Sequence, residues 1–263
     1  MTVRRLVAAA VPPLVFGVAF VLLWEAAVAV FDWKPYFLPA PSAIWDAFTD
    51  NADLVWDAVR VSGSNALVGL ITGTLLGIAM SFVLMRFRLL DHLVTPLAVA
   101  LNAIPIFVLV TVFNNMFAIT SQVPRRLMVT VVVYFIVLVN VARGLRQVSP
   151  IHLELMRSYA ASPGAVLRKT RIPNAVPFLF TALKIAAPAS VVTAFVAEYF
   201  GGTQTGLGNR ITSNVAASRN AIAWSYVLGA CLLGLAFYLF SVALESITTN
   251  KAGGRAPGGG ITT

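Results

Sequence analysis

The sequence predicts an all-α protein that crosses a membrane about six times. Hydrophobic residues make up 59% of the chain and charged residues 11%, whereas soluble domains carry about 25% charged residues. Several windows with few or no charges approach or exceed the length of about 20 apolar residues that a bilayer span requires. We therefore expect one transmembrane domain over residues 1–250, followed by a tail at 251–263 whose glycine and proline content predicts disorder.

The candidate spans cover residues 6–24, 61–85, 93–124, 127–142, 174–197 and 220–244. The first follows Arg4 and Arg5, as the apolar part of a signal peptide does, but it is longer than the roughly 7–15 residues of such a part. We therefore expect a helix that is retained. The third window is long enough for one span plus a loop.

Basic residues are distributed unequally between the two sides that these windows define. With the N-terminus inside, the inner segments hold 12 of them: Arg4, Arg5, Arg86, Arg88, Arg143, Arg146, Arg157, Arg168, Lys169, Arg171, Lys251 and Arg255. The outer segments hold 6: Lys34, Arg60, Arg125, Arg126, Arg210 and Arg219. The positive-inside rule therefore predicts that both termini are cytoplasmic. This topology accounts for most of the net charge of +9, which needs no nucleic-acid partner.

Between the first two windows, residues 32–60 contain an amphipathic pattern. Ser42 is placed to cap a helix. The apolar residues after it fall on one side of that helix: Ile44, Trp45, Phe48, Val55 and Trp56. The acidic residues fall on the other side: Asp46, Asp50, Asp53 and Asp57. The pattern indicates a helix at the outer interface of the membrane, and a plain connecting loop is the alternative.

Three glycines in the second window recur every four residues, at Gly69, Gly73 and Gly77, and Asn65 and Ser81 extend this spacing. Residues four apart share one helix face, and small residues there allow another helix to approach closely in lipid. We expect this face to pack against a helix of the same subunit, with a dimer seam as the alternative.

Polar residues inside the later windows are candidates for lining a pore: Asn102, Ser190, Thr193 and Glu198. Polar groups at membrane depth usually face a bundle interior or an aqueous path, and hydrogen bonding between helices is the alternative. Glu25 and Lys184 are the charges nearest to lipid, and we interpret both as structural.

The sequence carries no pattern that is typical of a catalytic or metal site. A P-loop requires G-x-x-x-x-G-K-[ST], and before the pair Lys169-Thr170 stands Arg168 instead of the required glycine. With two histidines and one cysteine, Cys231, we expect neither a zinc site nor an internal disulfide. We therefore expect a chain that is not an enzyme and that binds no cofactor itself.

The most informative segment is a basic, polar loop at residues 149–173, which separates two apolar windows. Ser149–Pro150 and Ser162–Pro163 each suit the start of a helix, with serine as the cap and proline at the first position. We expect two short helices at an angle, exposed to the cytoplasm, before the chain re-enters the membrane at Pro173.

This loop resembles the EAA loop of the permease subunits of binding-protein-dependent ABC importers. That signature reads E-A-A, three residues, G, nine residues, I, one residue, L and P. Glu154 and Pro173 match its glutamate and proline. The other positions are substituted, by Leu155 and Met156 for the alanines, Ala160 for the glycine, Thr170 for the isoleucine and Ile172 for the leucine.

The resemblance extends over residues 38–245 and is greatest to the sulfonate, nitrate and taurine branch of these permeases. It includes LPAPSAI at 38–44, the region 102–105, ALKIAAPASVVTAFVAEYFGG at 182–202 and GLG at 206–208. By contrast, FNN at 113–115 stands where that branch commonly has a Trp-Phe-Gly-like sequence.

The resemblance implies a type I ABC importer permease in a prokaryotic inner membrane, working with cytoplasmic ABC ATPases, an extracytoplasmic solute-binding protein and a second permease copy, identical or not. ATP and Mg would be bound by the ATPase. The loop at 149–173, called the coupling loop from here on, would dock in a groove of the ATPase through residues that include Glu154, Arg157, Ala160, Ala161, Ser162 and Pro173. Glu154 would make the key polar contact and Ala160 a close approach. A solvated charge near a helix N-terminus is the alternative for Glu154.

The alternative function is a self-sufficient secondary transporter. Such carriers commonly show an internal repeat, and none is visible in this sequence. The transported substrate is expected to be a small polar solute, and the sequence does not specify it further.

Overall fold

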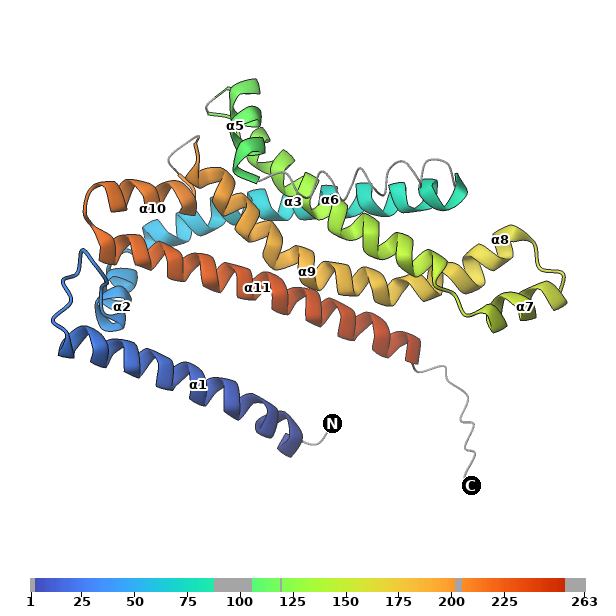
Figure 1. Cartoon of the computed structure of the whole chain (residues 1–263), viewed down its shortest axis with the longest axis horizontal. Helices are drawn as coiled ribbons and strands as arrows, with labels where there is room; N and C mark the ends of the chain where they lie inside the picture. Colours follow the sequence, from blue (N-terminus) through green and yellow to red (C-terminus); the bar gives the residue numbers. More distant parts are fainter. Residues whose placement is uncertain (1–2, 88–105, 119, 202–204, 254–263) are drawn as a thin grey trace.

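The computed structural model describes residues 3–87, 106–118, 120–201 and 205–253, and within these ranges every regular element is a helix. The elements are α1 (Val3–Val30), α2 (Pro41–Asp50), α3 (Ala52–Arg86), α5 (Ile106–Met116), α6 (Val123–Arg146), α7 (Pro150–Ser158), α8 (Pro163–Val166), the π-helix η1 (Leu167–Arg171), α9 (Ile172–Tyr199), α10 (Leu207–Ala216) and α11 (Asn220–Gly253). The predicted all-α class is confirmed. In Figure 1, α2 and α10 lie at one end of the molecule and α7 and α8 at the other.

Of the described helical segments, 5 are long and apolar enough to cross a membrane. They correspond to all the expected spans except the third. Residues 93–105 and 119 of that window, 93–124, lie outside the described residues, and its described part contains α5, which has 11 residues.

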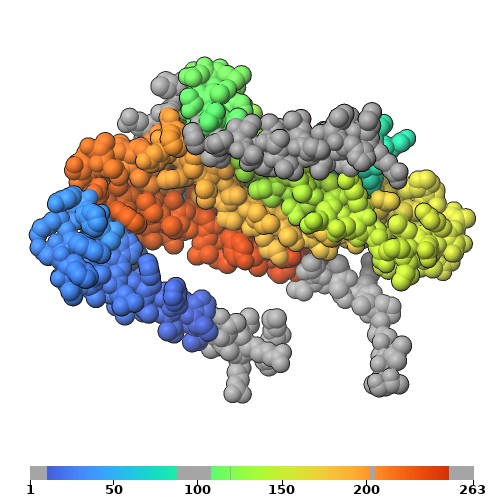
Figure 2. All heavy atoms as spheres, in the orientation of Figure 1, coloured from blue at the N-terminus to red at the C-terminus, as the bar shows by residue number. Residues whose placement is uncertain are grey.

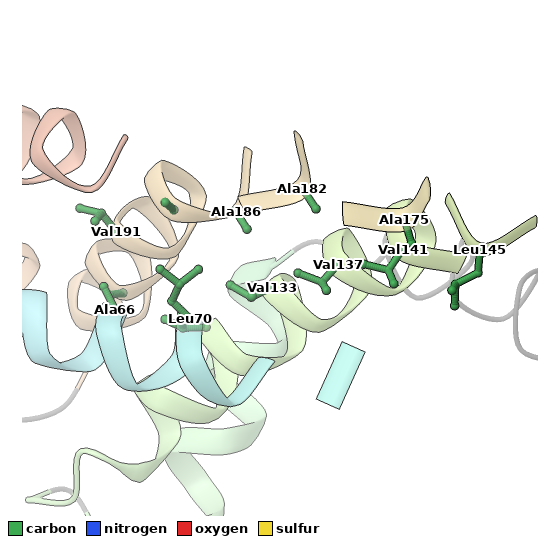
Figure 3. Packing of buried hydrophobic residues seen from close by; sticks show 13 residues of the cluster. Ala66, Leu70, Val133, Val137, Val141, Leu145, Ala175, Ala182, Ala186 and Val191 are labelled. Carbon is green, nitrogen blue, oxygen red and sulfur yellow. The ribbon is translucent and has the colours of Figure 1, made fainter. Parts of the chain in front are cut away.

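The core forms where α6 packs between α3 and α9. Apolar residues of α6 recur every four positions and are buried: Val129, Val133, Val137, Val141 and Leu145. Figure 3 shows this row facing Ala66 and Leu70 of α3 on one side and small residues of α9, such as Ala182 and Ala186, on the other.

The glycine stripe of α3 faces α6 of the same chain. A Cβ atom added at Gly73 would lie 2.7 Å from the carbonyl oxygen of Thr130, and one at Gly77 would lie 2.9 Å from that of Tyr134. An added Cβ at Gly69 would overlap the side chain of Val129. The two helices are therefore in backbone contact along this face, which only glycine permits.

The amphipathic segment between the first two spans forms two helices, which corrects the expectation of one. α2 ends at Asp50 and α3 begins at Ala52, so Trp56 belongs to the long helix. Ser42 is also not the cap, since α2 begins at Pro41. Instead, the Glu25 carboxylate of α1 accepts hydrogen bonds from the Ser42 backbone N–H at 3.0 Å and from Ser42 Oγ at 2.7 Å. A carboxylate at a helix N-terminus is favoured by the helix dipole.

The first helix stands apart from the rest of the chain. No residue of Val11–Val30 is buried. In Figure 2 its blue atoms meet the rest of the molecule at the end that carries α2, and there Trp24 packs edge-on against Trp224 with 5.5 Å between the ring centroids.

α8, η1 and α9 form one continuous helical segment, Pro163–Tyr199, so the second short helix that we expected in the loop continues without a break into the membrane helix at Pro173. Proline lacks an N–H and its ring clashes with the carbonyl four residues earlier. The π-helical turn before it, in which the Ile172 N–H bonds to the Leu167 carbonyl, widens the helix at this position.

α11 continues to Gly253, so residues 251–253, which we expected to belong to the tail, are helical. The remainder of the tail lies outside the described residues. Within the membrane part of α11, Glu245 pairs with Lys184 of α9 at 2.9 Å, which gives Lys184 the structural role that we expected.

Candidate functional site

The candidate site at one end of the molecule is the coupling loop, in which α7 projects from the helical bundle (Figure 1). None of its residues is buried. Ile151, Leu155 and Tyr159 recur every four residues and are 73%, 50% and 74% exposed. A helix of nine residues thus presents an apolar stripe to its surroundings, outside the candidate spans.

A Schellman motif ends α7 and defines the turn that follows it. The Ala160 N–H bonds to the Arg157 carbonyl at 2.8 Å, and the Ala161 N–H bonds to the Met156 carbonyl at 3.0 Å. The motif requires a left-handed residue after the helix, and Ala160 has φ of 49°. The signature glycine at this position therefore has a conformational reason, in addition to any close approach to a partner.

The second half of the coupling loop is attached to the end of α6. Ser162 caps α8 by accepting a hydrogen bond from the Ala165 N–H at 3.3 Å. Arg171 donates to the Leu145 carbonyl at 3.0 Å, and Asn174 donates to the Gly144 carbonyl at 2.7 Å. The bonds from Arg171 and Asn174 occupy free carbonyl groups at the C-terminus of α6 and hold η1 and the start of α9 against it.

The structure brings the predicted loop residues together around this turn. Glu154 and Arg157 are exposed on α7, and Ser162 and Pro163 follow the turn after Ala160. Among the described residues, no ion pair of the Glu154 carboxylate is found. Pro173 lies at the other end of η1, in the first turn of α9, and is therefore separated from Glu154 by the whole second half of the loop.

At the opposite end, a polar cluster lies inside the chain, with Glu198 at its centre. This residue is 1% exposed, and its carboxylate accepts from Ser62 Oγ at 2.6 Å, from Asn65 Nδ2 at 3.3 Å and from the Gly208 N–H at 3.3 Å. Its backbone carbonyl accepts from Asn209 Nδ2. We call the group formed by Ser62, Asn65, Gln122, Arg125 and Glu198 the Glu198 cluster.

Arg125 extends the Glu198 cluster to α6. It is 1% exposed and donates to Gln122 Oε1 at 3.0 Å and to the Gly201 carbonyl at 3.0 Å. Asn65 Nδ2 donates to the same oxygen of Gln122 at 2.9 Å. Four helices, α3, α6, α9 and α10, are joined in this way.

Three of the residues proposed to line a pore are buried within this chain. Ser190, Thr193 and Glu198 are at most 3% exposed. Ser190 and Thr193 donate to carbonyl oxygens of their own helix, at 2.7 and 2.8 Å. In this single chain these side chains are therefore enclosed and do not reach an open surface. Asn102 lies outside the described residues.

Sequence reasoning missed two features of these sites. The first is the apolar stripe of α7, which the four-residue spacing of Ile151, Leu155 and Tyr159 would have indicated. The second is the burial of Arg125, which we had counted as an outer surface charge. No local pattern distinguishes it from the adjacent Arg126, which is half-buried. Among the described residues, no group of three or more His, Cys, Asp or Glu side chains could hold a metal ion.

Known proteins resemble this chain over about three quarters of its length. A family model described as "Binding-protein-dependent transport system inner membrane component" matches residues 73–249. Among curated proteins, a probable ABC transporter permease protein of Haemophilus influenzae is 27% identical over 197 residues, which are 75% of this chain and 79% of the relative. The formylaminopyrimidine transport permease protein ThiX of Halalkalibacterium halodurans is 28% identical over 202 residues, 76% of this chain and 79% of the relative.

A bicarbonate transport system permease protein, CmpB of Synechocystis, is 25% identical over 219 residues, 74% of each chain. Among solved structures, a chain of the MetNI methionine ABC transporter in an inward-facing conformation superposes with a TM-score of 0.55 at 18% identity, over 73% of this chain and 94% of that chain. At this level of sequence identity, the likeness shows that the two chains share a fold.

Proposed function

Because the chain belongs to the family of binding-protein-dependent transport system inner membrane components, we propose that its coupling loop docks on a cytoplasmic ABC ATPase and transmits ATP-driven movement to the membrane helices. The chain is a permease subunit of an ABC importer. This family implies an ATPase partner and a solute-binding protein.

The observation that carries the proposal is the exposed apolar stripe of α7. Exposed apolar surface in water is unfavourable by about 25 cal/mol per Å² relative to its burial, and the stripe of Ile151, Leu155 and Tyr159 is exposed outside the membrane spans. A short helix with anchors at i, i+4 and i+8 is suited to an apolar groove of a partner protein. Docking in such a groove would cover the stripe.

Polar residues beside the stripe would fix the orientation of the docked helix. Glu154 lies next to Leu155 on α7 and is exposed, so a basic residue of the ATPase is its expected partner. Arg157 projects from the same helix. The tight turn through Ala160, Ala161 and Ser162 would allow the ATPase to approach the backbone.

The continuous segment from α8 to α9 offers a route for the movement. Pro163–Tyr199 spans 37 residues without interruption. Displacement of α8 by the ATPase would therefore act directly on a helix that crosses the membrane, and the anchoring of Arg171 to the end of α6 would carry α6 with it.

The remaining parts of the proposed importer follow from this assignment. The chain works with a second permease copy, and the ATPase binds ATP and Mg, so the permease itself is not an enzyme. Both termini are cytoplasmic, in a prokaryotic inner membrane. The transported substrate is a small polar solute. Two relatives are named for transport of such solutes, formylaminopyrimidine and bicarbonate. The solute-binding protein selects it, since Ser190 and Thr193 are buried within this chain.

Copurification with the tagged chain from its native host tests the proposal. We expect a near-stoichiometric P-loop ATPase with the parent chain and an at least tenfold lower yield with Leu155→Asp, which places a charge in the docked stripe. Thr49→Asp, at an exposed position of α2 at the other end of the molecule, is the control and should retain the ATPase. In reconstituted vesicles, Glu154→Arg should uncouple ATP hydrolysis from uptake.

Two results would contradict the docking assignment. One is full ATPase recovery and full uptake with both Leu155→Asp and Glu154→Arg. The other is active uptake by a preparation that contains no ATPase, which would instead support a secondary transporter.

A further inference from the structure

An apolar groove of about 950 Å³ runs between α3 and α11 on the surface of the chain. Its volume is at the upper end of the roughly 300–1,000 Å³ that is usual for small-molecule sites. Aromatic rings of Trp56, Phe237 and Phe240 contribute to its walls, and Gly63 and Gly229 to its floor. Neither the proposed transport path nor the coupling loop uses this groove.

The part of the groove beyond Arg60 corresponds in length to one leaflet of a bilayer. Along α3 the groove extends from Ala52 to Leu70, and Arg60, within it, precedes the apolar run of that helix. From Arg60 to Leu70 the distance is about 15 Å at 1.5 Å per residue, which is half of a hydrocarbon core of about 30 Å. This part of the groove therefore lies against the acyl chains of the leaflet on the α2 side, with Arg60 at the level of the headgroups and the part from Ala52 to Val59 on the water side of that level.

At the level of Arg60, which we call its mouth, the groove carries one charge of each sign. Arg60 is the only charged residue among the described residues that line the groove. Asp57 lies one helical turn before it, and 4.0 Å separate Arg60 Nη1 from the Asp57 carboxylate. Their side chains are 66% and 72% exposed. An exposed pair at this distance contributes little stability, so both groups are available to a ligand.

Trp56 holds the guanidinium of Arg60 in position. The Arg60 Cζ atom lies 5.1 Å from the centroid of the Trp56 ring, a cation–π arrangement. Tryptophan is enriched at the membrane–water interface, which agrees with the headgroup level assigned to Arg60.

We propose that this groove binds one zwitterionic phospholipid of the phosphatidylethanolamine type. One acyl chain lies along α3 and α11, the phosphate contacts Arg60, and the ammonium group donates to Asp57. An anionic headgroup fits this mouth less well, because Asp46, Asp50 and Asp53 are exposed on α2 and in the first turn of α3 and would repel its net charge. The inference does not depend on the identity of the transported solute or on the docking of the ATPase.

Native mass spectrometry of the purified importer, delipidated and then supplied with dioleoyl phosphatidylethanolamine or dioleoyl phosphatidylglycerol, tests the proposal. We expect one phosphatidylethanolamine retained per chain, and more of it than of phosphatidylglycerol. Gly63→Leu should reduce its occupancy at least tenfold by filling the groove. A Cβ atom at this position would lie 3.4 Å from Leu233 Cδ1, an ordinary contact, so the variant is compatible with the fold.

Gly234→Leu is the matched control, since no atom lies within 4 Å of a Cβ added there and the residue does not line the groove. It should retain the lipid as the parent does. At the exposed mouth, Arg60→Gln should lower phosphatidylethanolamine retention severalfold, and Asp57→Asn should reduce the preference over phosphatidylglycerol.

Equal retention by Gly63→Leu and the parent, or equal binding of the two lipids by the parent, would overturn the proposal. A protein occupant is a further outcome that would overturn it. In a Cys231→Ser background, disulfide crosslinking of Gly63→Cys to Val18→Cys of α1 in good yield would show that α1, of this copy or a second one, fills the groove.

Discussion

The Glu198 carboxylate connects three helices, α3, α9 and α10. Its partners Ser62 and Asn65 are 136 and 133 residues away in the sequence, and the Gly208 N–H belongs to α10. Neighbouring glycines leave room for it, because a Cβ atom added at Gly206 would overlap the Glu198 carboxylate. Buried polar groups are costly when they lack partners, so each member of the Glu198 cluster depends on the others.

Removal of this carboxylate should destabilise the protein. Glu198→Ala leaves the hydroxyl of Ser62 and the N–H of Gly208 without an acceptor, and one buried unpaired donor costs about 1–3 kcal/mol. We expect a clearly lower midpoint of thermal unfolding for the protein in mild detergent, and a smaller decrease for Glu198→Gln, which keeps one acceptor oxygen. The exposed Glu154→Ala serves as the control and should unfold as the parent does. A parent-like midpoint for Glu198→Ala would show that the cluster does not stabilise the fold.

At the scale of single elements, the end of α7 shows how one backbone conformation shapes the coupling loop. The alignment to the EAA signature indicated that Ala160 replaces a glycine, and we interpreted this position as one of close approach. The structure adds that the residue is left-handed, with φ of 49°. This conformation is unfavourable for an L-residue other than glycine by roughly 1–2 kcal/mol.

Ala160→Gly should therefore stabilise the coupling loop by about 1 kcal/mol. The expected result is slower amide hydrogen exchange in residues 156–161, measured by mass spectrometry. The neighbouring Ala161→Gly is the control. It should speed exchange, because glycine there adds only freedom to the unfolded loop. Faster exchange in both variants would contradict the left-handed conformation of Ala160.

The whole molecule has its two polar sites at opposite ends of a helical bundle. The Glu198 carboxylate accepts from the Gly208 N–H of α10, and α10 lies at one end of the molecule with α2, whereas α7 and α8 of the coupling loop lie at the other (Figure 1). The start of α1 and the end of α11 point toward the end with the coupling loop. The bundle itself is held by close packing of α3, α6 and α9, and α1 takes little part in it.

The charge distribution predicts which end is cytoplasmic, and cysteine labelling of intact cells can test this. In a Cys231→Ser background, a membrane-impermeant maleimide should label Thr49→Cys on α2 and should leave Ser158→Cys on α7 unlabelled. Both positions are exposed in the chain. After the cells are broken, both cysteines should react. The reverse pattern in intact cells would contradict the proposed orientation.

The sequence by itself determined the all-α membrane class, the glycine face of α3, the coupling loop and the family. These features depend on composition and on spacing within a single segment, where periods of four residues and helix-start signals are local. The position of Glu198 could not be predicted in this way. Its neighbours come from three other helices, and no local pattern separates a polar side chain that faces a pore from one that faces another helix.

Only the tertiary structure decided that Ser190, Thr193 and Glu198 lie inside the bundle, that α8 continues into α9, and that α3 and α11 enclose a groove. Each of these depends on contacts between segments that are distant in sequence or on how the chain accommodates Pro173 in a continuous helix. The physical reason is that burial in a close-packed bundle is a property of several helices together. The sequence of a single helix shows which of its faces are apolar or small, but not which other helix covers each face.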